Sequence, residues 1–308
     1  MKSGAREKVP AAVLCVGNLT VGGEGKTPVA IALAKEAKRR KIAVGFLTRG
    51  YGGSLAKPHM VDAEKDSATL VGDEPLLLAR HAPTVIASDR VAGARRLIDA
   101  GVGLIIMDDG FQSARIHMDY ALIVIDAGRG LGNGRVIPGG PLRAPLTEQM
   151  RHANAVVTMG EGSAADAVIR AASRAGRAVF SARVKPLRAR GFKGVRVLAF
   201  AGIGNPQKFF DTLSRIGAEV VRSRSFPDHH PFTKEEIAEL VSEAAAEGLL
   251  LVTTEKDLVR LRNGPPELRD RAASIEALPI EAVFDTAHAP EAILRDTINA
   301  WRTRALKS

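Results

Sequence analysis

The sequence predicts an α/β protein in which helices cover both faces of a parallel sheet, followed by a second, smaller α/β domain. Short apolar runs alternate with segments of helical spacing through the first 175 residues, a pattern typical of parallel strands joined by crossover helices. The alternation breaks in a basic stretch with Pro and Gly at 184–194 and then restarts. At 308 residues the chain is also longer than one hydrophobic core usually serves, so two domains are expected.

The first domain is expected at 1–185. Its strands are expected at the apolar runs 12–16, 42–48, 84–87, 104–107, 122–125 and 155–159. Its helices are expected at 28–40, 74–80, 90–99 and 164–175. The first helix has apolar residues at helical spacing and ends in a basic turn, which suits the negative end of a helix dipole. The runs at 104–107 and 122–125 are almost wholly apolar, as strands buried on both faces are.

A linker or hairpin is expected at 186–194, because Pro186, Gly191 and Gly194 interrupt the periodicity. The smaller domain then covers 195–308. Its strands are expected at 197–201, 219–223 and 249–253, and its helices at 206–216, 234–247 and 290–304. The last of these helices could pack back onto the first domain.

Composition excludes several classes of protein. No apolar run approaches the roughly 18 residues that span a bilayer, and no charged-then-apolar leader opens the chain, so a chain in or facing the cytosol is expected. The single cysteine, Cys15, excludes an internal disulfide framework. The formal net charge of +10 indicates an anionic partner. Basic residues are scattered and aromatic residues are only 4%, which argues against nucleic acid.

The strongest motif is Gly22-Gly23-Glu24-Gly25-Lys26-Thr27, between the first strand and the first helix. It is nearly a P-loop, in which backbone N–H groups at a helix N-terminus surround phosphate oxygens. Lys26 would reach the β- and γ-phosphates, and the Thr27 hydroxyl would bind Mg²⁺. The usual first glycine of the motif is replaced by Thr20.

Two acidic segments are candidate partners of this loop. Asp108 and Asp109 follow a buried strand, where P-loop enzymes hold Mg²⁺, although an Asp-Asp-Gly sequence alone is more often a turn. Asp73 lies in Val-Gly-Asp-Glu-Pro and is either a helix N-cap or a general base for a hydroxyl.

Other segments are weaker candidates. His229 and His230 are adjacent and so point apart, which disfavours a metal site and favours tuning of a carboxylate. A loop rich in Gly and Pro ends in Arg143, which could meet a phosphate. The segment Thr-Glu-Lys-Asp at 254–257 could hold a nucleotide base or cap a helix.

The ordered set of motifs resembles the tetraacyldisaccharide 4′-kinases of lipid A biosynthesis over roughly residues 13–260. The matching segments are VGNLTVGGEGKTP at 16–28, LTRGYGG at 47–53, VGDEP at 71–75, DDGFQ at 108–112, IPGGPLR ending at 143, AGIGNPQKFF at 201–210, FPDHH at 226–230 and TEKD at 254–257. No single motif is decisive, but the set in this order is highly specific. Thr20 in the loop also resembles the family's variant.

The resemblance implies an enzyme that uses ATP and Mg²⁺ to phosphorylate the 4′-hydroxyl of tetraacyldisaccharide 1-phosphate, giving lipid IVA. It implies a position at the cytoplasmic face of the inner membrane and a lipid disaccharide substrate. Since no apolar run spans a bilayer, contact with an anionic membrane surface is expected to be peripheral and largely electrostatic, and no obligate protein partner is evident. It also implies roles for individual residues. These are the catalytic pair Asp73 and His229, the P-loop residues Lys26 and Thr27 with Thr20, Gly22, Gly23 and Gly25, the acidic pair Asp108 and Asp109 near Mg²⁺, and Arg143.

The chain departs from the family pattern at three places. Ala144 stands where the family usually has glutamate, and Ser113 where it usually has histidine. The stretch at 1–11 is also shorter than the amphipathic, aromatic-rich segment that usually precedes the first strand. An alternative interpretation is a P-loop ATPase or GTPase switch that hydrolyses nucleotide without a lipid acceptor.

Overall fold

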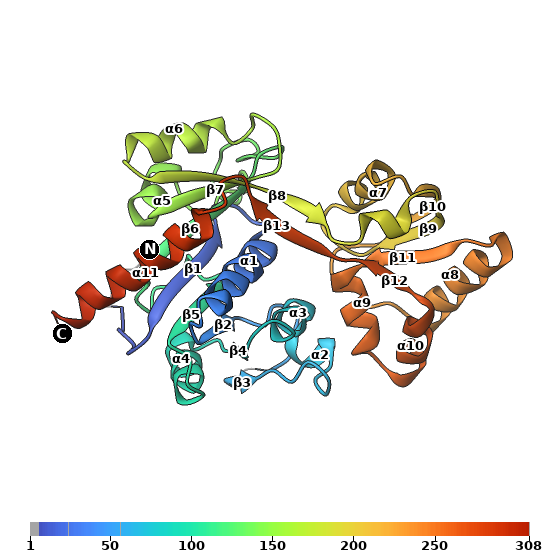
Figure 1. Cartoon of the computed structure of the whole chain (residues 1–308), viewed down its shortest axis with the longest axis horizontal. Helices are drawn as coiled ribbons and strands as arrows, with labels where there is room; N and C mark the ends of the chain where they lie inside the picture. Colours follow the sequence, from blue (N-terminus) through green and yellow to red (C-terminus); the bar gives the residue numbers. More distant parts are fainter. Residues whose placement is uncertain (1–5, 24, 56, 308) are drawn as a thin grey trace.

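A computed structural model describes residues 6–23, 25–55 and 57–307, so the expectation for the start of the chain lies partly outside the described residues. Its larger sheet has nine strands in the order β13-β8-β7-β6-β1-β5-β2-β4-β3 (Figure 1). The strands are β1 (Ala12–Asn18), β2 (Val44–Thr48), β3 (His59–Met60), β4 (Thr84–Ile86), β5 (Leu104–Asp108), β6 (Tyr120–Asp126), β7 (Ala155–Met159), β8 (Ala178–Pro186) and β13 (Ile280–Phe284). Only the outermost pairs, β13 with β8 and β3 with β4, are antiparallel.

Helices cover both faces of this sheet, as expected. On one face, α4 (Arg90–Asp99), α5 (Leu146–His152) and α6 (Asp166–Arg174) pack over alternate strand residues such as Val13 and Ile105. On the other face, α1 (Lys26–Arg39), α3 (Asp73–Ala79) and α11 (Ala289–Ala305) pack over Leu14 and Ile106. Successive side chains of a strand point to opposite faces, so each central strand contributes to both cores.

The smaller sheet is parallel and has the strand order β10-β9-β11-β12. Its strands are β9 (Arg196–Ala201), β10 (Glu219–Ser225), β11 (Leu250–Thr254) and β12 (Glu276–Leu278). Around it lie η1 (Ala189–Phe192), α7 (Pro206–Arg215), α8 (Lys234–Glu247), α9 (Glu255–Arg262), α10 (Pro266–Arg271) and η2 (Ala272–Ser274). One apolar cluster joins the sheet to α8, α9 and α10, and another joins it to α7.

Two strands of the larger sheet, β8 and β13, connect the two sheets. β8 leaves the larger sheet and β13 returns to it, and the two pair antiparallel (Figure 1). β13 therefore belongs to the larger sheet and α11 packs on it, although both lie in the segment 195–308 that is expected to form the smaller domain. Arg304 of α11 holds this end in place, since its Nε donates to Asp119 Oδ1 at 2.7 Å and its Nη2 to the carbonyl of Ala11 at 3.2 Å.

A second contact between the two parts is made by helices. α9 of the smaller part packs against α3 of the larger part, and Val259 joins the apolar cluster around Leu76 and Leu77. α3 follows the short helix α2 (Ala68–Val71). Figure 1 shows α9 and α10 facing α2 and α3 across the junction. β1 and β5 end beside the loop that precedes α1, which is the P-loop. The P-loop therefore lies near this junction.

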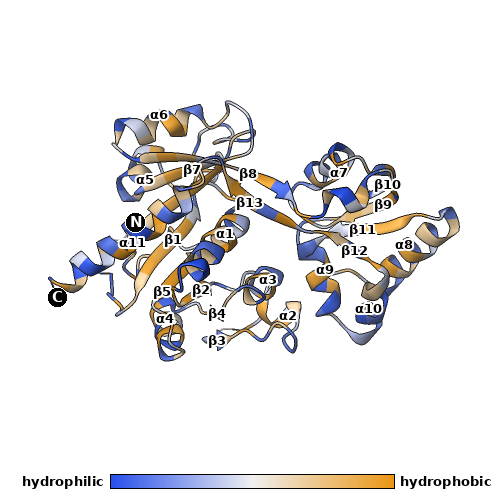
Figure 2. Ribbon diagram, viewed as in Figure 1, coloured by the Kyte–Doolittle hydropathy of each residue, from blue (hydrophilic) through white to orange (hydrophobic). Residues whose placement is uncertain are grey.

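None of the described helices is both long enough and apolar enough to cross a bilayer. Figure 2 shows that apolar residues are concentrated in the strands of the two sheets.

Candidate active site

The glycine-rich loop joins β1, which ends at Asn18, to α1, which begins at Lys26. Gly25 caps the helix in the left-handed conformation with φ 86°, which glycine adopts readily. The carbonyl of Gly22 accepts hydrogen bonds from Asn18 Nδ2 at 3.1 Å and from Lys26 Nζ at 3.4 Å. A Cβ atom on Gly23 would meet nothing within 4 Å, so this part of the loop faces open space. The loop thus presents a helix N-terminus and an ammonium group, which fit phosphate oxygens.

Asp109 draws two cations to the loop. Its carboxylate lies 3.7 Å from Lys26 Nζ and 3.8 Å from Arg143 Nη2. Its backbone has φ 54°, an uncommon value for a residue with a Cβ atom. Arg143 also donates from Nε to the carbonyl of Thr20 at 3.1 Å. The structure therefore brings together Lys26, Arg143 and Asp109, which are far apart in the sequence.

Asp108 is buried at the end of β5, and its Oδ2 accepts from the Thr27 hydroxyl at 3.1 Å. Burial, reinforced by the negative charge of Glu74, raises the pKa of Asp108 to about 7 despite the opposing charge of Lys26. Its Oδ1 has no hydrogen-bond partner among the described residues. A buried, unpartnered carboxylate oxygen beside a threonine hydroxyl fits a hard divalent cation.

The metal would need further ligands from outside the protein. No group of three or more His, Cys, Asp or Glu side chains converges as a metal site anywhere in the described part of the chain. Mg²⁺ commonly takes only one or two protein carboxylates and completes its shell with water and substrate phosphates. The residues present, Thr27 and Asp108 with Asp109 adjacent, therefore fit Mg²⁺ bound together with a nucleotide, and they do not fit a zinc centre.

Asp73 begins α3, and its buried carboxylate contacts two groups from the smaller part of the protein. His229 Nδ1 lies 3.2 Å from Asp73 Oδ1, and Arg260 Nη2 donates to Oδ2 at 2.5 Å. Burial alone would raise the pKa of Asp73, but the hydrogen bond to His229 and the charges of Arg260 and Lys256 outweigh it and hold that pKa well below its usual range. The same hydrogen bond raises the pKa of His229, against the effect of burial. Asp73 is therefore ionised at neutral pH.

Asp73, His229 and Arg260 are called the Asp73 group below. Lys256 lies between this group and the buried carboxylate of the phosphate-binding site. Its Nζ donates to Glu74 Oε1 at 2.5 Å, and the charges of Asp73 and Asp108 both help to raise its pKa, although burial opposes them. Lys256 and Arg260 are four residues apart on α9 and so share one helix face. This face presents two cations to the acidic start of α3.

The sequence did not identify Arg260 or Lys256 as functional residues. The Lys-Asp-x-x-Arg spacing from 256 to 260 places both cations on one face of a helix, and that signal could have found them. Of the two roles expected for 254–257, a helix cap or a contact to a nucleotide base, the structure shows the cap. Thr254 caps α9 by accepting from the backbone N–H of Asp257 at 3.2 Å. His230 does not contact Asp73. Its Nε2 instead lies 2.9 Å from Glu236 Oε2.

The departures from the family pattern have simple structural settings. The carbonyl of Ala144 accepts from Gln149 Nε2 at 2.7 Å, and the backbone N–H of Ser113 donates to Gly110 at 2.9 Å. Neither contact requires the side chain at that position.

Known proteins resemble this chain over most of its length. The sequence model of the family described as tetraacyldisaccharide-1-P 4′-kinase matches residues 2–299. A tetraacyldisaccharide 4′-kinase of Chelativorans sp. (strain BNC1) is 67% identical over 307 residues, covering 100% of this chain and 90% of that protein. The enzyme of the same name from Agrobacterium fabrum (strain C58 / ATCC 33970) is 50% identical and is covered to 88% of its length, again with 100% of this chain.

A solved structure is also similar. The crystal structure of LpxK from Aquifex aeolicus in complex with ATP superimposes with a TM-score of 0.72 and 27% identity, covering 95% of this chain and 90% of that one. The match of the family model to nearly the whole chain, and the high identity to the two relatives, lead to the same assignment. The chain belongs to the tetraacyldisaccharide-1-P 4′-kinase family.

Proposed function

We propose that the protein is an ATP- and Mg²⁺-dependent kinase that phosphorylates the 4′-hydroxyl of tetraacyldisaccharide 1-phosphate to give lipid IVA. The observation that carries this proposal is the Asp73–His229 pair, which joins a carboxylate of the larger part to an imidazole of the smaller part at 3.2 Å. A carboxylate oriented by an imidazole can accept the proton of an attacking sugar hydroxyl, which is a poor nucleophile at neutral pH. The pair lies next to Glu74 and Lys256, whose charges also act on Asp108 of the phosphate-binding site.

The residues of the loop act on charge. Phosphoryl transfer depends mainly on positioning and on neutralising the charge of the transferred group. Lys26 and Arg143 supply positive charge near the open face of the glycine-rich loop. Thr27 and Asp108 would hold Mg²⁺, which when bound polarises the phosphate oxygens.

Asp73 acts on the acceptor. Its carboxylate takes the proton of the attacking 4′-hydroxyl, while the oxygen of that hydroxyl forms the new P–O bond and the bond to the nucleoside diphosphate breaks. Asp73 Oδ1 faces His229 Nδ1 and also accepts from the backbone N–H of Glu74 at 3.0 Å, whereas Oδ2 accepts from Arg260. Each carboxylate oxygen has two lone pairs, so Oδ2 keeps one for the hydroxyl. His229 fixes the orientation of Asp73. A positioned base of this kind contributes about 10²–10⁴-fold to the rate.

The test is ADP release by the purified protein with ATP and Mg²⁺ in detergent, with and without tetraacyldisaccharide 1-phosphate. The proposal predicts that ADP release depends on the lipid acceptor and matches the phosphorylated lipid formed. ADP release of equal rate without the acceptor would favour the alternative, a P-loop hydrolase.

We also propose that the protein acts as a peripheral protein at the cytoplasmic face of the inner membrane. The acceptor carries acyl chains and so resides in a bilayer. The net charge of +10 favours contact with an anionic leaflet, where each basic residue near the surface contributes about 1 kcal/mol. Binding to anionic vesicles at low salt, with release by about 1 M salt where the screening length is about 3 Å, supports this; binding that persists at high salt contradicts it.

A further inference from the structure

A cavity of about 490 Å³ lies beside the α3–α9 contact. It is lined by Ala63, Glu64, Arg80, Arg262, Asn263 and Arg269. Asn263 ties its two sides together, because its Nδ2 donates to the carbonyls of Ala63 at 2.9 Å and Asp66 at 3.0 Å. The cavity is therefore built from both parts of the protein, as the Asp73 group is.

The lining is strongly cationic. It carries Arg80, Arg262 and Arg269 against the single carboxylate of Glu64. Within the described part of the chain, no carboxylate lies within 4.0 Å of any of the three guanidinium groups. The charge of Arg80 acts at longer range on Glu255, whose pKa is raised by burial and partly lowered again by that charge. Elsewhere on the surface many arginines do pair with carboxylates, as Arg39 and Arg40 do with Glu36. Three unpaired guanidinium groups around one cavity form an environment that favours a polyanion such as a phosphate.

The cavity has a defined position relative to Asp73. Arg80 is the C-cap of α3 and Asp73 is its first residue. Seven residues span about two helical turns, so the two side chains lie on the same helix face about 10 Å apart along the axis. Arg262 is the last residue of α9 and lies two positions after Arg260, which contacts Asp73. The cavity is thus about the length of α3 away from the carboxylate that takes the proton of the acceptor's hydroxyl.

We propose that this cavity binds the phosphate at position 1 of the acceptor, an inference that rests on the proposed function. The family description names an acceptor with a phosphate at position 1 that is phosphorylated at position 4′. These positions lie at opposite ends of two linked sugar rings, a span comparable with the length of α3. Arginine binds phosphate through paired N–H groups. The cavity would therefore select acceptors that already carry the first phosphate and would orient the far sugar toward Asp73.

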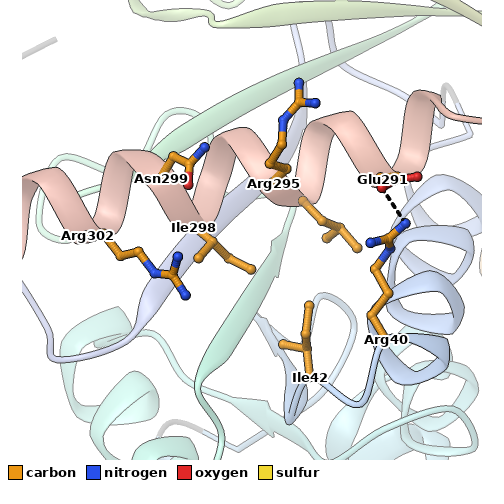
Figure 3. Close-up of a pocket in the computed structure, with 8 residues that line it drawn as sticks. Arg40, Ile42, Glu291, Arg295, Ile298, Asn299 and Arg302 are labelled. Atoms are coloured by element: carbon orange, nitrogen blue, oxygen red, sulfur yellow. Dashed lines mark ion pairs between the residues drawn. The ribbon is translucent and has the colours of Figure 1, made fainter.

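The experiment compares two acceptors in neutral detergent without anionic lipid. One is tetraacyldisaccharide 1-phosphate and the other is the same lipid without its phosphate. The variants are Arg80→Ala, Arg262→Ala and Arg269→Ala, singly and together, with thermal unfolding to show that each is folded. The matched control is Arg302→Ala, which changes an arginine lining the cavity between α11 and the end of α1 (Figure 3). That cavity is at the end of α1 remote from the phosphate-binding loop.

For the phosphorylated acceptor, each single variant is expected to raise KM about 3- to 10-fold, since it removes one charge-assisted contact to the phosphate while the other two arginines remain. The triple variant should raise KM further with kcat little changed, and Arg302→Ala should match the wild type. For the acceptor without phosphate, wild type and triple variant should share one high KM. The proposal is overturned if the wild type uses both acceptors with equal KM, or if the variants impair both acceptors alike. Failure of the wild type to phosphorylate either acceptor would instead overturn the proposed function, and this site with it.

Discussion

Lys26 stands at the start of α1 with its ammonium group 3.4 Å from the carbonyl of Gly22 and 3.7 Å from a carboxylate oxygen of Asp109. Both contacts are made by the ammonium group, which places a charge in the loop, and the side chain is 11% exposed. Lys26→Ala is therefore expected to lower kcat by about 10²–10³-fold, as removal of one electrostatic stabiliser does, while leaving the protein folded. Lys35→Ala on the same helix, whose side chain is 47% exposed, is the control. Near-normal turnover by folded Lys26→Ala would refute this role.

The Asp73–His229 pair should behave as one unit. Asp73→Ala and His229→Ala are each expected to reduce kcat by about 10²–10⁴-fold. The double variant should lose little more than the worse single variant, because groups that act together are strongly non-additive. Initial rates at saturating ATP and acceptor measure this. If the two losses simply multiply, the residues work separately.

The same pair predicts a pH dependence of stability. Asp73 raises the pKa of His229 above its ordinary value of 6.5, so the charged pair stabilises the fold fully below pH 6.5 and loses that contribution as pH rises through the folded pKa. The difference in free energy of unfolding between wild type and His229→Ala should therefore shrink as pH rises above 6.5. Urea titrations at a series of pH values measure it, and a difference that is constant or grows with pH would contradict the assignment.

At the scale of single elements, α9 carries both Lys256 and Arg260 and is capped by Thr254. The Thr254 hydroxyl also donates to Asp257 Oδ2 at 2.7 Å, and Asp257 Oδ1 accepts from Arg260 at 2.8 Å. The cap therefore supports the side chain that contacts Asp73. Sequence reasoning named this segment but could not place it, because the partner of Arg260 is 187 residues away.

Two cap variants separate stability from function. Thr254→Ala and Thr233→Ala each remove an N-cap, the latter from the capping box of α8, and each should cost about 1 kcal/mol of stability. Only Thr254→Ala is expected to lower kcat as well, because α8 contributes no residue to the Asp73 group. Urea unfolding and initial rates on both variants test this. Equal activity of the two variants would mean that the cap of α9 has no effect on the site.

Elements differ in how well their sequence reveals them. The buried strands β5 and β6 are continuous apolar runs and were predicted within a few residues. β8 was missed as a strand, because only Ala182 along its length is fully buried and its end runs into the basic stretch 184–194 that predicts a linker. β13 was missed for a related reason, since its pairing with β8 joins residues nearly 100 positions apart.

At the scale of the whole molecule, the sequence indicated the α/β class, the P-loop and the order of the motifs. It did not indicate that α3 and α9 would meet, because that contact depends on the path of β8 and β13 between the two sheets. Arg260 and the arginine-lined cavity follow from this contact alone. A residue whose partner lies in another part of the chain leaves little trace in local periodicity or spacing.

The proposed reaction transfers the γ-phosphoryl group of ATP to one hydroxyl of the lipid acceptor. The most direct measurement is the reaction of tetraacyldisaccharide 1-phosphate with ATP and Mg²⁺, followed by phosphorus NMR and tandem mass spectrometry of the lipid product. We expect a bisphosphorylated lipid with the new phosphate on the 4′ oxygen and one ADP formed per phosphate transferred. Unchanged lipid with inorganic phosphate released, or a new phosphate on another oxygen, would contradict it.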